Sequence, residues 1–358
     1  MFKKLSLENF RNHKKFEIDL DRITVLVGLN GAGKSNILEA MTMLSFCRSF
    51  REEDKRNLIN YDQDYARIVG DDLEIFITKT PRLFMQAKEK GISRKLSDFI
   101  GLLPTVVFSS ETILIITGSP SDRRRFLDVM ISQINSEYLR TLISYKKVKQ
   151  QRNNLLQRIF QRQGEEDELD FWDKELVRLG SIIIKEREEA VLIIDSALPE
   201  LYQSISGDSK ADFKVGYLKS FEGEMEEALR RFRRREIASG RTIFGPHRDD
   251  IIFTLDGRNM ANFASRGEIR SAILALKIAE LKYLENIKKK SLRESNNSAK
   301  PILLLDDIFS EFDPERRAHL GELVSQYQSL ITSTEESHLS PELLKKAKVI
   351  EIVNNRRF

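Results

Sequence analysis

Residues 28–35 combine glycines, a lysine and a serine at the spacing of a phosphate-binding loop. The segment GLNGAGKS fits the pattern GxxxxGK[ST] and lies between an unbroken β-branched run and a predicted helix. The glycines let the backbone curl so that successive N–H groups face phosphate oxygens, and the helix start adds a favourable dipole. We predict that Lys34 holds the outer phosphates and Ser35 binds magnesium, the alternative being an ordinary glycine turn. The predicted nucleotide-binding residues here are Gly28, Leu29, Asn30, Gly31, Ala32, Gly33, Lys34, Ser35 and Asn36.

A second chemical signal is a pair of carboxylates after the apolar run Ile302–Leu305. Such a run is typical of a central parallel strand, whose carboxyl end points into the ligand crevice of an α/β sheet. We predict that Asp306 binds magnesium through water and that Asp307 orients or deprotonates the attacking water. By itself an Asp-Asp pair is more often a turn or a helix cap. Together with Lys34, the two aspartates form the predicted catalytic set.

A third segment, Ala264-Ser-Arg-Gly-Glu268, precedes an apolar helix. A serine followed by glycine at a helix start can offer a hydroxyl and backbone N–H groups to a phosphate. We therefore single out Ser265 and Gly267. The simpler interpretation of Ser265 is a helix N-cap.

The elements that must position these residues form an α/β fold. Three strands are predicted over 2–10, 16–20 and 23–27, and the character changes to helical at about residue 121, with long helices over 138–160 and 171–194 that could pair antiparallel. Strand-like runs return at 242–244, 251–255 and 302–305, and a helix is predicted over 267–288. We predict an ATPase-like head in two parts, 1–118 and 241–358, interrupted by a helical lobe over 119–240. The polar stretch 291–300 is predicted to be a surface loop.

Composition narrows the class of protein. Lys and Arg total 59 against 55 for Asp and Glu, so the net charge of +4 is too small for the surface as a whole to bind polyanions. Cys47 is the one cysteine, which excludes an internal disulfide and any zinc site built on paired cysteines; we expect it to pack in the core. No stretch approaches the length of an apolar membrane span and the start lacks a leader-like segment, so we expect a cytoplasmic protein without a membrane partner.

Binding to nucleic acid would therefore depend on local basic patches. Two arginine-rich runs and a lysine-rich stretch of the helical lobe are the densest, although a charge run on a helix is usually a solvated face and nearby glutamates could pair with the second run. Because no base-reading motif is present, we expect recognition of backbone and shape. The candidate DNA-binding residues are Arg123, Arg124, Arg230, Arg231, Arg233, Arg234, Lys146 and Lys147.

Several motifs, in the same order along the chain, resemble the ABC-type ATPases and, more closely, the bacterial RecF family. They are LENFRNH, GLNGAGKSNILEAM, GSPSDRRRFLD, GPHRDD, ASRGEIRSAILALKIAE, LLLDDIFSEFD and ITSTE. The resemblance spans nearly the whole chain. It implies an ABC-type P-loop head interrupted by a mostly helical second lobe, with ATP and Mg²⁺ as cofactors.

The resemblance also implies roles for single residues. Arg11 and His13 would lie near the adenine and phosphates, and Thr334 would be part of a sensor with Thr332. In this family the segment that contains Ser265 and Gly267 is called the signature, and the two residues would meet the γ-phosphate bound by a second protomer. Asp313 would lie in the loop after the predicted strand at 302–305. This chain departs from the family at Arg266 and Glu268, positions where the family commonly carries glutamine.

The family's known role implies partners. An ATP-dependent homodimer would bind duplex DNA and single-strand/double-strand junctions and, with RecR and RecO, promote loading of RecA at gaps during recombinational repair, replication restart and the SOS response. Because the family uses Asp307 where most of the wider class uses glutamate, its shorter reach suggests slow, DNA-stimulated ATP turnover.

Other function classes remain open from the residues alone. A chromosome-organising tether shares this head but needs a far longer coiled coil, and an ABC-type ATPase could instead regulate a protein partner. A transporter's energy-coupling subunit would not explain LENFRNH or GSPSDRRRFLD, and no second acidic constellation indicates a nuclease. His247, beside two aspartates, is more simply part of a turn than of a metal site, because no second histidine or cysteine lies at ligand spacing.

Overall fold

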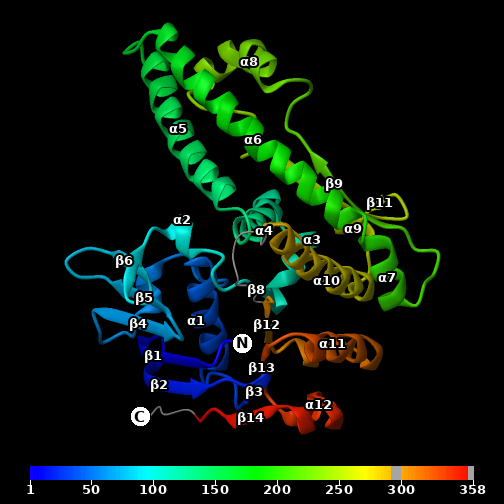
Figure 1. Cartoon of the computed structure of the whole chain (residues 1–358). Helices are drawn as coiled ribbons and strands as arrows, with labels where there is room; N and C mark the ends of the chain where they lie inside the picture. Colours follow the sequence, from blue (N-terminus) through cyan, green and yellow to red (C-terminus); the bar gives the residue numbers. More distant parts are fainter. Residues whose placement is uncertain (292–299, 354–358) are drawn as a thin grey trace. The chain divides into compact units, whose positions relative to one another are not determined.

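The computed structural model describes the backbone of residues 1–291 and 300–353. The chain divides into two compact units, the first of residues 1–113 with 270–358 and the second of residues 114–269. Most of the predicted surface loop at 291–300 lies outside the described residues. Each unit has its own sheet or sheets and its own helices (Figure 1).

The first unit contains a parallel sheet that carries the predicted phosphate loop and aspartate pair. Its strand order is β14-β3-β13-β12-β8, and every neighbouring pair is parallel. The residues of β3, β12 and β13 are almost all buried, as expected where both faces of a parallel sheet are covered, whereas the edge strand β14 is mostly exposed. Their bounds are β3 Ile23–Val27, β8 Thr105–Phe108, β12 Ile302–Asp306, β13 Ser329–Ser333 and β14 Lys348–Glu351.

An antiparallel sheet completes this unit, with the order β2-β1-β4-β5-β6-β7. Helix α1, Lys34–Phe46, packs into the apolar core that joins the two sheets, and Cys47 is buried there as predicted. The antiparallel strands are β1 Lys4–Phe10, β2 His13–Asp19, β4 Tyr65–Gly70, β5 Leu73–Thr78, β6 Phe84–Glu89 and β7 Ile92–Arg94. The remaining helices of the unit are α2 Leu96–Phe99, α11 Pro314–Gln326 and α12 Pro341–Lys346, with short 3₁₀ turns at Lys55–Leu58, Ser110–Ile113, Ile308–Ser310 and Glu336–His338.

The second unit is mostly helical. Helices α5, Ser136–Phe160, and α6, Leu169–Asp195, lie side by side and run in opposite directions, as the sequence predicted (Figure 1). Asn135 caps the start of α5 by accepting a hydrogen bond from the Tyr138 backbone. The other helices are α3 Leu114–Thr117, α4 Pro120–Ser132, α7 Leu198–Ser206, α8 Met225–Ser239 and α9 Met260–Phe263, while α10, Arg266–Ser291, begins in this unit and continues into the first.

A small sheet in the second unit corrects two predictions. Strand β10, Asp250–Leu255, pairs antiparallel with β9, Phe213–Leu218, and with β11, Arg258–Asn259. The sequence placed β10 in the head and did not identify β9. Because strand pairing holds residues 250–259 in the second unit, that unit extends to Ile269 and begins at Leu114, in place of the predicted 119–240.

The predicted strand at 242–244 is also wrong. The backbone N–H of Thr242 donates to Asn153 Oδ1 (2.8 Å), and that of Ile243 donates to Glu236 Oε1 (2.9 Å). Since side chains satisfy these donors, the segment is held as a loop without a ladder partner.

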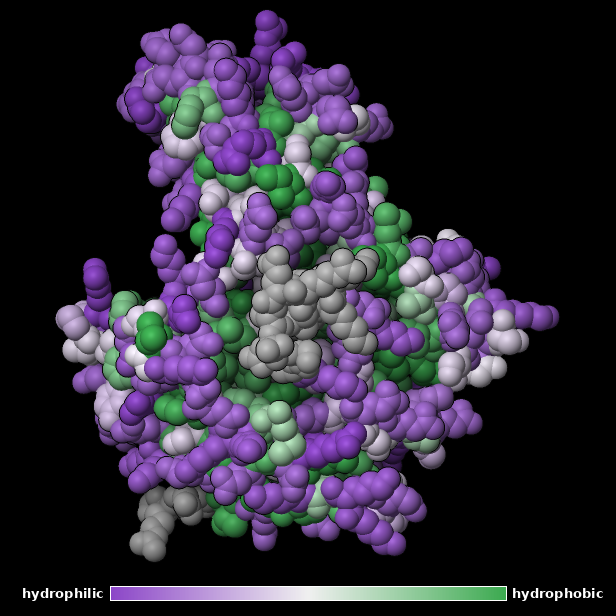
Figure 2. Space-filling model, in the orientation of Figure 1, coloured by the Kyte–Doolittle hydropathy of each residue, from purple (hydrophilic) through white to green (hydrophobic). Residues whose placement is uncertain are grey.

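Hydrophilic residues cover most of the face drawn in Figure 2. Among the described residues, none of the helices combines the length and apolar character needed to cross a membrane.

Candidate nucleotide site

The phosphate loop begins at the end of β3 and ends at the start of α1. Gly33 has a left-handed backbone, with φ of 102°, and a Cβ there would come within 2.7 Å of the Asn12 and His13 side chains. At Gly28 a Cβ would lie 2.4 Å from the Ile352 carbonyl oxygen. Only glycine therefore fits these two positions, which explains their place in the motif.

The lysine of the motif points back into the loop. Lys34 Nζ donates to the carbonyl oxygens of Gly28 (2.7 Å) and Leu29 (3.2 Å), and the residue is buried. Leu29 and Asn30 at the tip are exposed. The ammonium group is thus already positioned over the loop whose backbone N–H groups would surround phosphate oxygens.

His13 and its neighbour Asn12 hold the rear of the loop. His13 Nε2 lies 3.1 Å from the Gly33 carbonyl oxygen, and Asn12 Nδ2 donates to the Ala32 carbonyl (3.2 Å). Burial lowers the pKa of His13, opposed by the Gly33 contact, so the ring is neutral at physiological pH. Asn36 Nδ2 donates to Asn12 Oδ1 (2.7 Å). The sequence did not predict Asn12, although its place beside two predicted site residues was a usable signal.

Arg11 pairs with a carboxylate within the fold, and its place near the adenine and phosphates stays a prediction. Its guanidinium donates twice to the fully buried Glu39 carboxylate, at 2.8 and 2.7 Å, and Arg51 also pairs with Glu39. Glu39 lies on α1 one turn beyond Ser35 and was not identified from the sequence. Because a buried carboxylate requires a paired charge, the structural role of Arg11 is to neutralise Glu39 and join β1 to the loop helix.

The two aspartates lie at the end of β12, next to β13. Thr332 Oγ1 donates to Asp306 Oδ1 (2.9 Å) and accepts from the Asp307 backbone N–H (2.9 Å). Asp307 has a left-handed backbone, with φ of 53°, immediately beyond the strand. In the parallel register Asp306 is opposite Thr332, and Thr332 is opposite Leu26. The carboxyl ends of β12, β13 and β3 therefore bring the aspartates and the phosphate loop to one edge of the sheet.

The electrostatics of Asp307 suit a proton acceptor. Burial raises the pKa of its carboxyl; the Lys34 charge opposes that shift, Asp306 adds to it, and His338 opposes it. The raised pKa makes Asp307 a stronger base than an exposed aspartate.

The same edge of the sheet has oxygen ligands suited to magnesium. Asp306 uses Oδ1 for the Thr332 hydroxyl, which leaves Oδ2 for an ion or its water, and Ser35 lies in the first turn of α1. Carboxylate and hydroxyl oxygens, with several waters, are the ligands that Mg²⁺ prefers. These residues fit the predicted ion, which when bound would neutralise phosphate charge.

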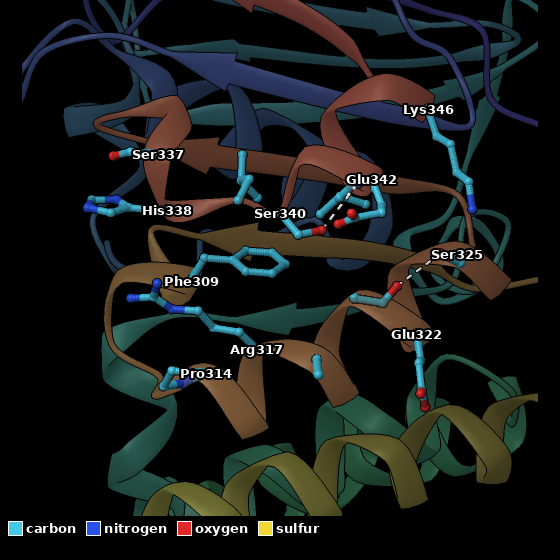
Figure 3. Close-up of a pocket in the computed structure, with 14 residues that line it drawn as sticks. Phe309, Pro314, Arg317, Glu322, Ser325, Ser337, His338, Ser340, Glu342 and Lys346 are labelled. Carbon is cyan, nitrogen blue, oxygen red and sulfur yellow. Dashed lines mark hydrogen bonds between the residues drawn. The ribbon is translucent and has the colours of Figure 1, made fainter.

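Near these strand ends the first unit has a pocket of about 540 Å³ between α11 and α12 (Figure 3). Phe309, two residues after Asp307, and His338 line it; His338 Nδ1 lies 3.3 Å from the Ser333 hydroxyl at the end of β13. Thr334, the predicted sensor residue, follows β13 directly and is partly buried. Asp313 caps α11 by accepting from the Arg316 backbone (3.0 Å), and its carboxylate also pairs with the Arg316 guanidinium.

The signature segment starts α10 with a capping box. Glu268 accepts from the Ser265 backbone N–H (2.6 Å), and the Glu268 N–H donates to Ser265 Oγ (3.3 Å). The N-cap interpretation of Ser265 is therefore correct, and it explains why glutamate serves at position 268. Since the Ser265 hydroxyl only accepts in this box and Ser265 is exposed, its hydrogen remains available to a phosphate.

The candidate DNA-binding residues differ in how far they are already paired. Arg123 is only 11% exposed and pairs through two bonds with Asp250, while Arg233 pairs with Asp170 and Asp173. Other pairings on α4 and α8 are Arg124 with the Asp249 carbonyl, Arg230 with Glu226, and Arg231 over the Phe232 ring. Arg234, Lys146 and Lys147 are exposed. The structure thus engages much of both arginine runs within the fold.

Residues 1–356 match the family model described as the RecF/RecN/SMC N terminal domain. The chain is 34% identical to the DNA replication and repair protein RecF of Herpetosiphon aurantiacus, covering 96% of this chain and 95% of that protein. It is 35% identical to the protein of that name from Lachnoclostridium phytofermentans, over 93% and 92%. The chain belongs to the RecF family. The sequence-based assignment to this family is confirmed.

Solved structures agree with this membership. A structure of the recombination mediator protein RecF with ATP superimposes with a TM-score of 0.85 at 30% identity, covering 95% of this chain and 93% of that one. A structure described as RecF-ATPrS in the RecFOR pathway gives the same TM-score at 29% identity, over 99% and 96%. A Smc head domain from Pyrococcus furiosus, at 16% identity and a TM-score of 0.53, shares the fold. The predicted ABC-type ATPase head is therefore confirmed for this RecF-family chain.

Proposed function

We propose that this protein is an ATP-driven DNA clamp of recombinational repair. It binds ATP with Mg²⁺ at the phosphate loop, pairs with a second copy, and holds duplex DNA or single-strand/double-strand junctions until hydrolysis releases them. The observation that carries the proposal is the convergence of the phosphate loop, Asp306, Asp307 and Thr332 at the carboxyl ends of β3, β12 and β13. RecF-family membership, with relatives named as DNA replication and repair proteins, supports the DNA role.

The residues divide the work of ATP hydrolysis. Lys34 and the loop N–H groups hold the phosphates, and Ser35 with Asp306 holds the ion. Asp307 accepts a proton from the attacking water, helped by its raised pKa. Its side chain is one methylene shorter than the glutamate of most ABC-type ATPases, so we expect slow turnover, stimulated by DNA.

Pairing of two copies would place the signature of one on the nucleotide of the other. Ser265 supports this role because its hydroxyl hydrogen is free while its backbone is fixed by Glu268. In the cytoplasm the paired form would act with RecR and RecO to promote RecA loading at gaps, and so serve replication restart and the SOS response.

Fluorescence anisotropy of labelled gapped, duplex and single-stranded DNA tests the clamp directly. The full chain is compared with ATP, ADP or no nucleotide at matched salt, beside Lys34→Met and Ser265→Arg. We expect ATP to raise affinity for duplex or gapped DNA and both substitutions to abolish the increase. Nucleotide-independent binding would refute the clamp and favour the alternative, an ATPase that regulates a protein partner.

A further inference from the structure

A rigid turn in the second unit presents one exposed arginine. The turn, Gly245–Asp250, is held from below by Arg187, which donates to the Pro246 carbonyl (2.6 Å), and by the Tyr145 hydroxyl, 2.9 Å from His247 Nδ1. Arg187 and Tyr145 are fully buried. Arg248, whose backbone N–H closes the turn by donating to the Gly245 carbonyl (2.7 Å), is exposed, and no ion pair or side-chain hydrogen bond engages its guanidinium within the described residues. The turn therefore fixes the backbone position of Arg248 and leaves its guanidinium without an ion-pair partner among the described residues.

The carboxylates around this turn are already committed to other groups. Asp249 is fully buried and accepts from a tyrosine hydroxyl (2.6 Å) and a backbone N–H (2.8 Å). Asp250 forms its two-bond pair with Arg123, and Asp128 pairs with Arg187. None of the three is thus free to neutralise Arg248.

Three other cations gather beside Arg248. Arg124 of α4 donates to the Asp249 carbonyl (2.8 Å), which places it under the turn. Lys149 lies one helical turn beyond Tyr145 on α5, on the face that touches the turn, and Lys146 lies within one turn of Lys149. Among the described residues neither lysine has a carboxylate partner within ion-pair distance.

The charges in this group act on one another. Burial lowers the pKa of Lys149, and the positive charges of Lys146, Arg248 and Arg124 lower it further. Burial lowers the pKa of His247 to about 3, and Lys149, Arg248 and Arg124 add to that effect, so the imidazole contributes no charge. Such a group of mutually repelling cations is stabilised by an anion that binds several of them at once.

We propose that Arg124, Lys146, Lys149 and Arg248 form a phosphate-binding site for the DNA backbone, here called the turn site. The inference rests on the proposed DNA-binding function and assigns a surface to it. We prefer the turn site to the arginine run of α8 as the DNA contact, because Arg230 and Arg233 of that run already form ion pairs with acidic residues. With no base-reading geometry required, the site suits sequence-independent contact with phosphates.

The test compares charge removal inside and outside the turn site. Binding of labelled duplex DNA by the full chain with ATP is measured over a series of salt concentrations for wild type, Arg248→Ala, Lys149→Ala and the double variant. Lys174→Ala is the matched control, because Lys174 is exposed on α6 and is not among the candidate DNA-binding residues. ATP hydrolysis without DNA should be unchanged in all four variants.

Each turn-site substitution should weaken DNA binding and lower the slope of log affinity against log salt by about 0.9 per lost phosphate contact. Lys174→Ala should leave the slope unchanged. If wild type binds DNA and the turn-site variants behave like Lys174→Ala, the inference is overturned and the clamp proposal stands. If wild type binds no DNA with any nucleotide, the clamp proposal itself has failed.

Two further probes separate other anions from DNA. Inorganic pyrophosphate at matched ionic strength should displace DNA poorly; strong displacement that requires Arg248 would assign the turn site to a small phosphate compound instead. Polyglutamate should also compete weakly. If Arg248→Ala abolishes polyglutamate binding but leaves DNA binding intact, the surface belongs to an acidic protein partner and the inference is overturned.

Discussion

Arg152 is buried completely in the helical lobe, and its removal should destabilise that lobe strongly. Its guanidinium donates to Asp173 (2.7 Å), to Glu236 (2.6 Å) and to the Thr242 hydroxyl (2.9 Å), which joins α5, α6, α8 and the loop after α8. Replacing Arg152 with Met keeps most of the volume but leaves the buried Glu236 carboxylate without a counter-charge. Breaking a buried pair in this way costs about 3–5 kcal/mol of unfolding free energy.

The single tryptophan makes this measurement specific to the lobe. Trp172 lies beside Asp173 on α6 and packs on the apolar cluster of Leu155, Leu156, Ile159 and Leu169. Its fluorescence during urea unfolding of the full chain therefore reports the unfolding free energy of this region. The matched control is Arg178→Met on the same helix, because Arg178 pairs with Glu175 at the surface and its loss should change stability by less than about 1 kcal/mol.

The pH dependence provides a second check. Burial raises the folded-state pKa of Glu236, and Arg152 opposes that shift. Without Arg152 the folded-state pKa of Glu236 moves further above its unfolded-state value. The variant therefore shows its full loss of unfolding free energy at pH values above the folded-state pKa of Glu236. As the pH falls toward the unfolded value, the folded carboxyl takes up a proton and the penalty shrinks. Arg152→Met combined with Glu236→Gln should recover part of the stability. A loss no larger than that of Arg178→Met, or one independent of pH, would refute the reasoning.

Three further predictions concern the nucleotide site. Asp307→Asn should keep ATP affinity but slow hydrolysis by about 10²–10⁴-fold. Because burial raises the pKa of the Asp307 carboxyl, the wild-type rate of hydrolysis should begin to decline, as the pH falls, above the pH at which an ordinary aspartate takes up its proton. An equal loss of ATP binding and hydrolysis in the variant, or a wild-type rate that is flat down to about pH 4, would contradict this. Gly33→Ala should weaken ATP binding, measured by calorimetry, because its left-handed backbone and the crowding by Asn12 and His13 exclude a Cβ; unchanged affinity would argue against it. Thr332→Val should slow ATP hydrolysis, measured as phosphate release, and should lower the free energy of unfolding by about 1–3 kcal/mol, because it leaves the Asp307 backbone N–H without an acceptor. Thr332→Ser keeps the hydroxyl and should behave like wild type.

Local chemistry was sufficient to locate the phosphate loop and the aspartate pair in the sequence. The phosphate loop depends on glycines at backbone positions that no other residue fits, and the aspartates directly follow an apolar strand, so each signal is contained in a short run of consecutive residues. The two long helices were predictable for a similar reason, since their apolar spacing records the face that each buries.

Contacts between distant segments decided the rest. The central strand β10 of the small sheet pairs with β9, about 37 residues earlier, and no local property of either strand specifies that partner. Asp306 and Thr332 meet only because β12 and β13 are neighbours in the parallel sheet. Arg123 and Arg233 belong to basic runs, yet acids from other elements neutralise them. Arg248, which the sequence did not mark as a DNA contact, has no ion-pair partner among the residues that the structure describes, and Arg187 holds the turn that carries it. The sequence by itself determined the family, the nucleotide-binding motif and the two long helices of the helical lobe. Only the tertiary structure decided which charges remain available, because pairing depends on which side chains folding brings within reach.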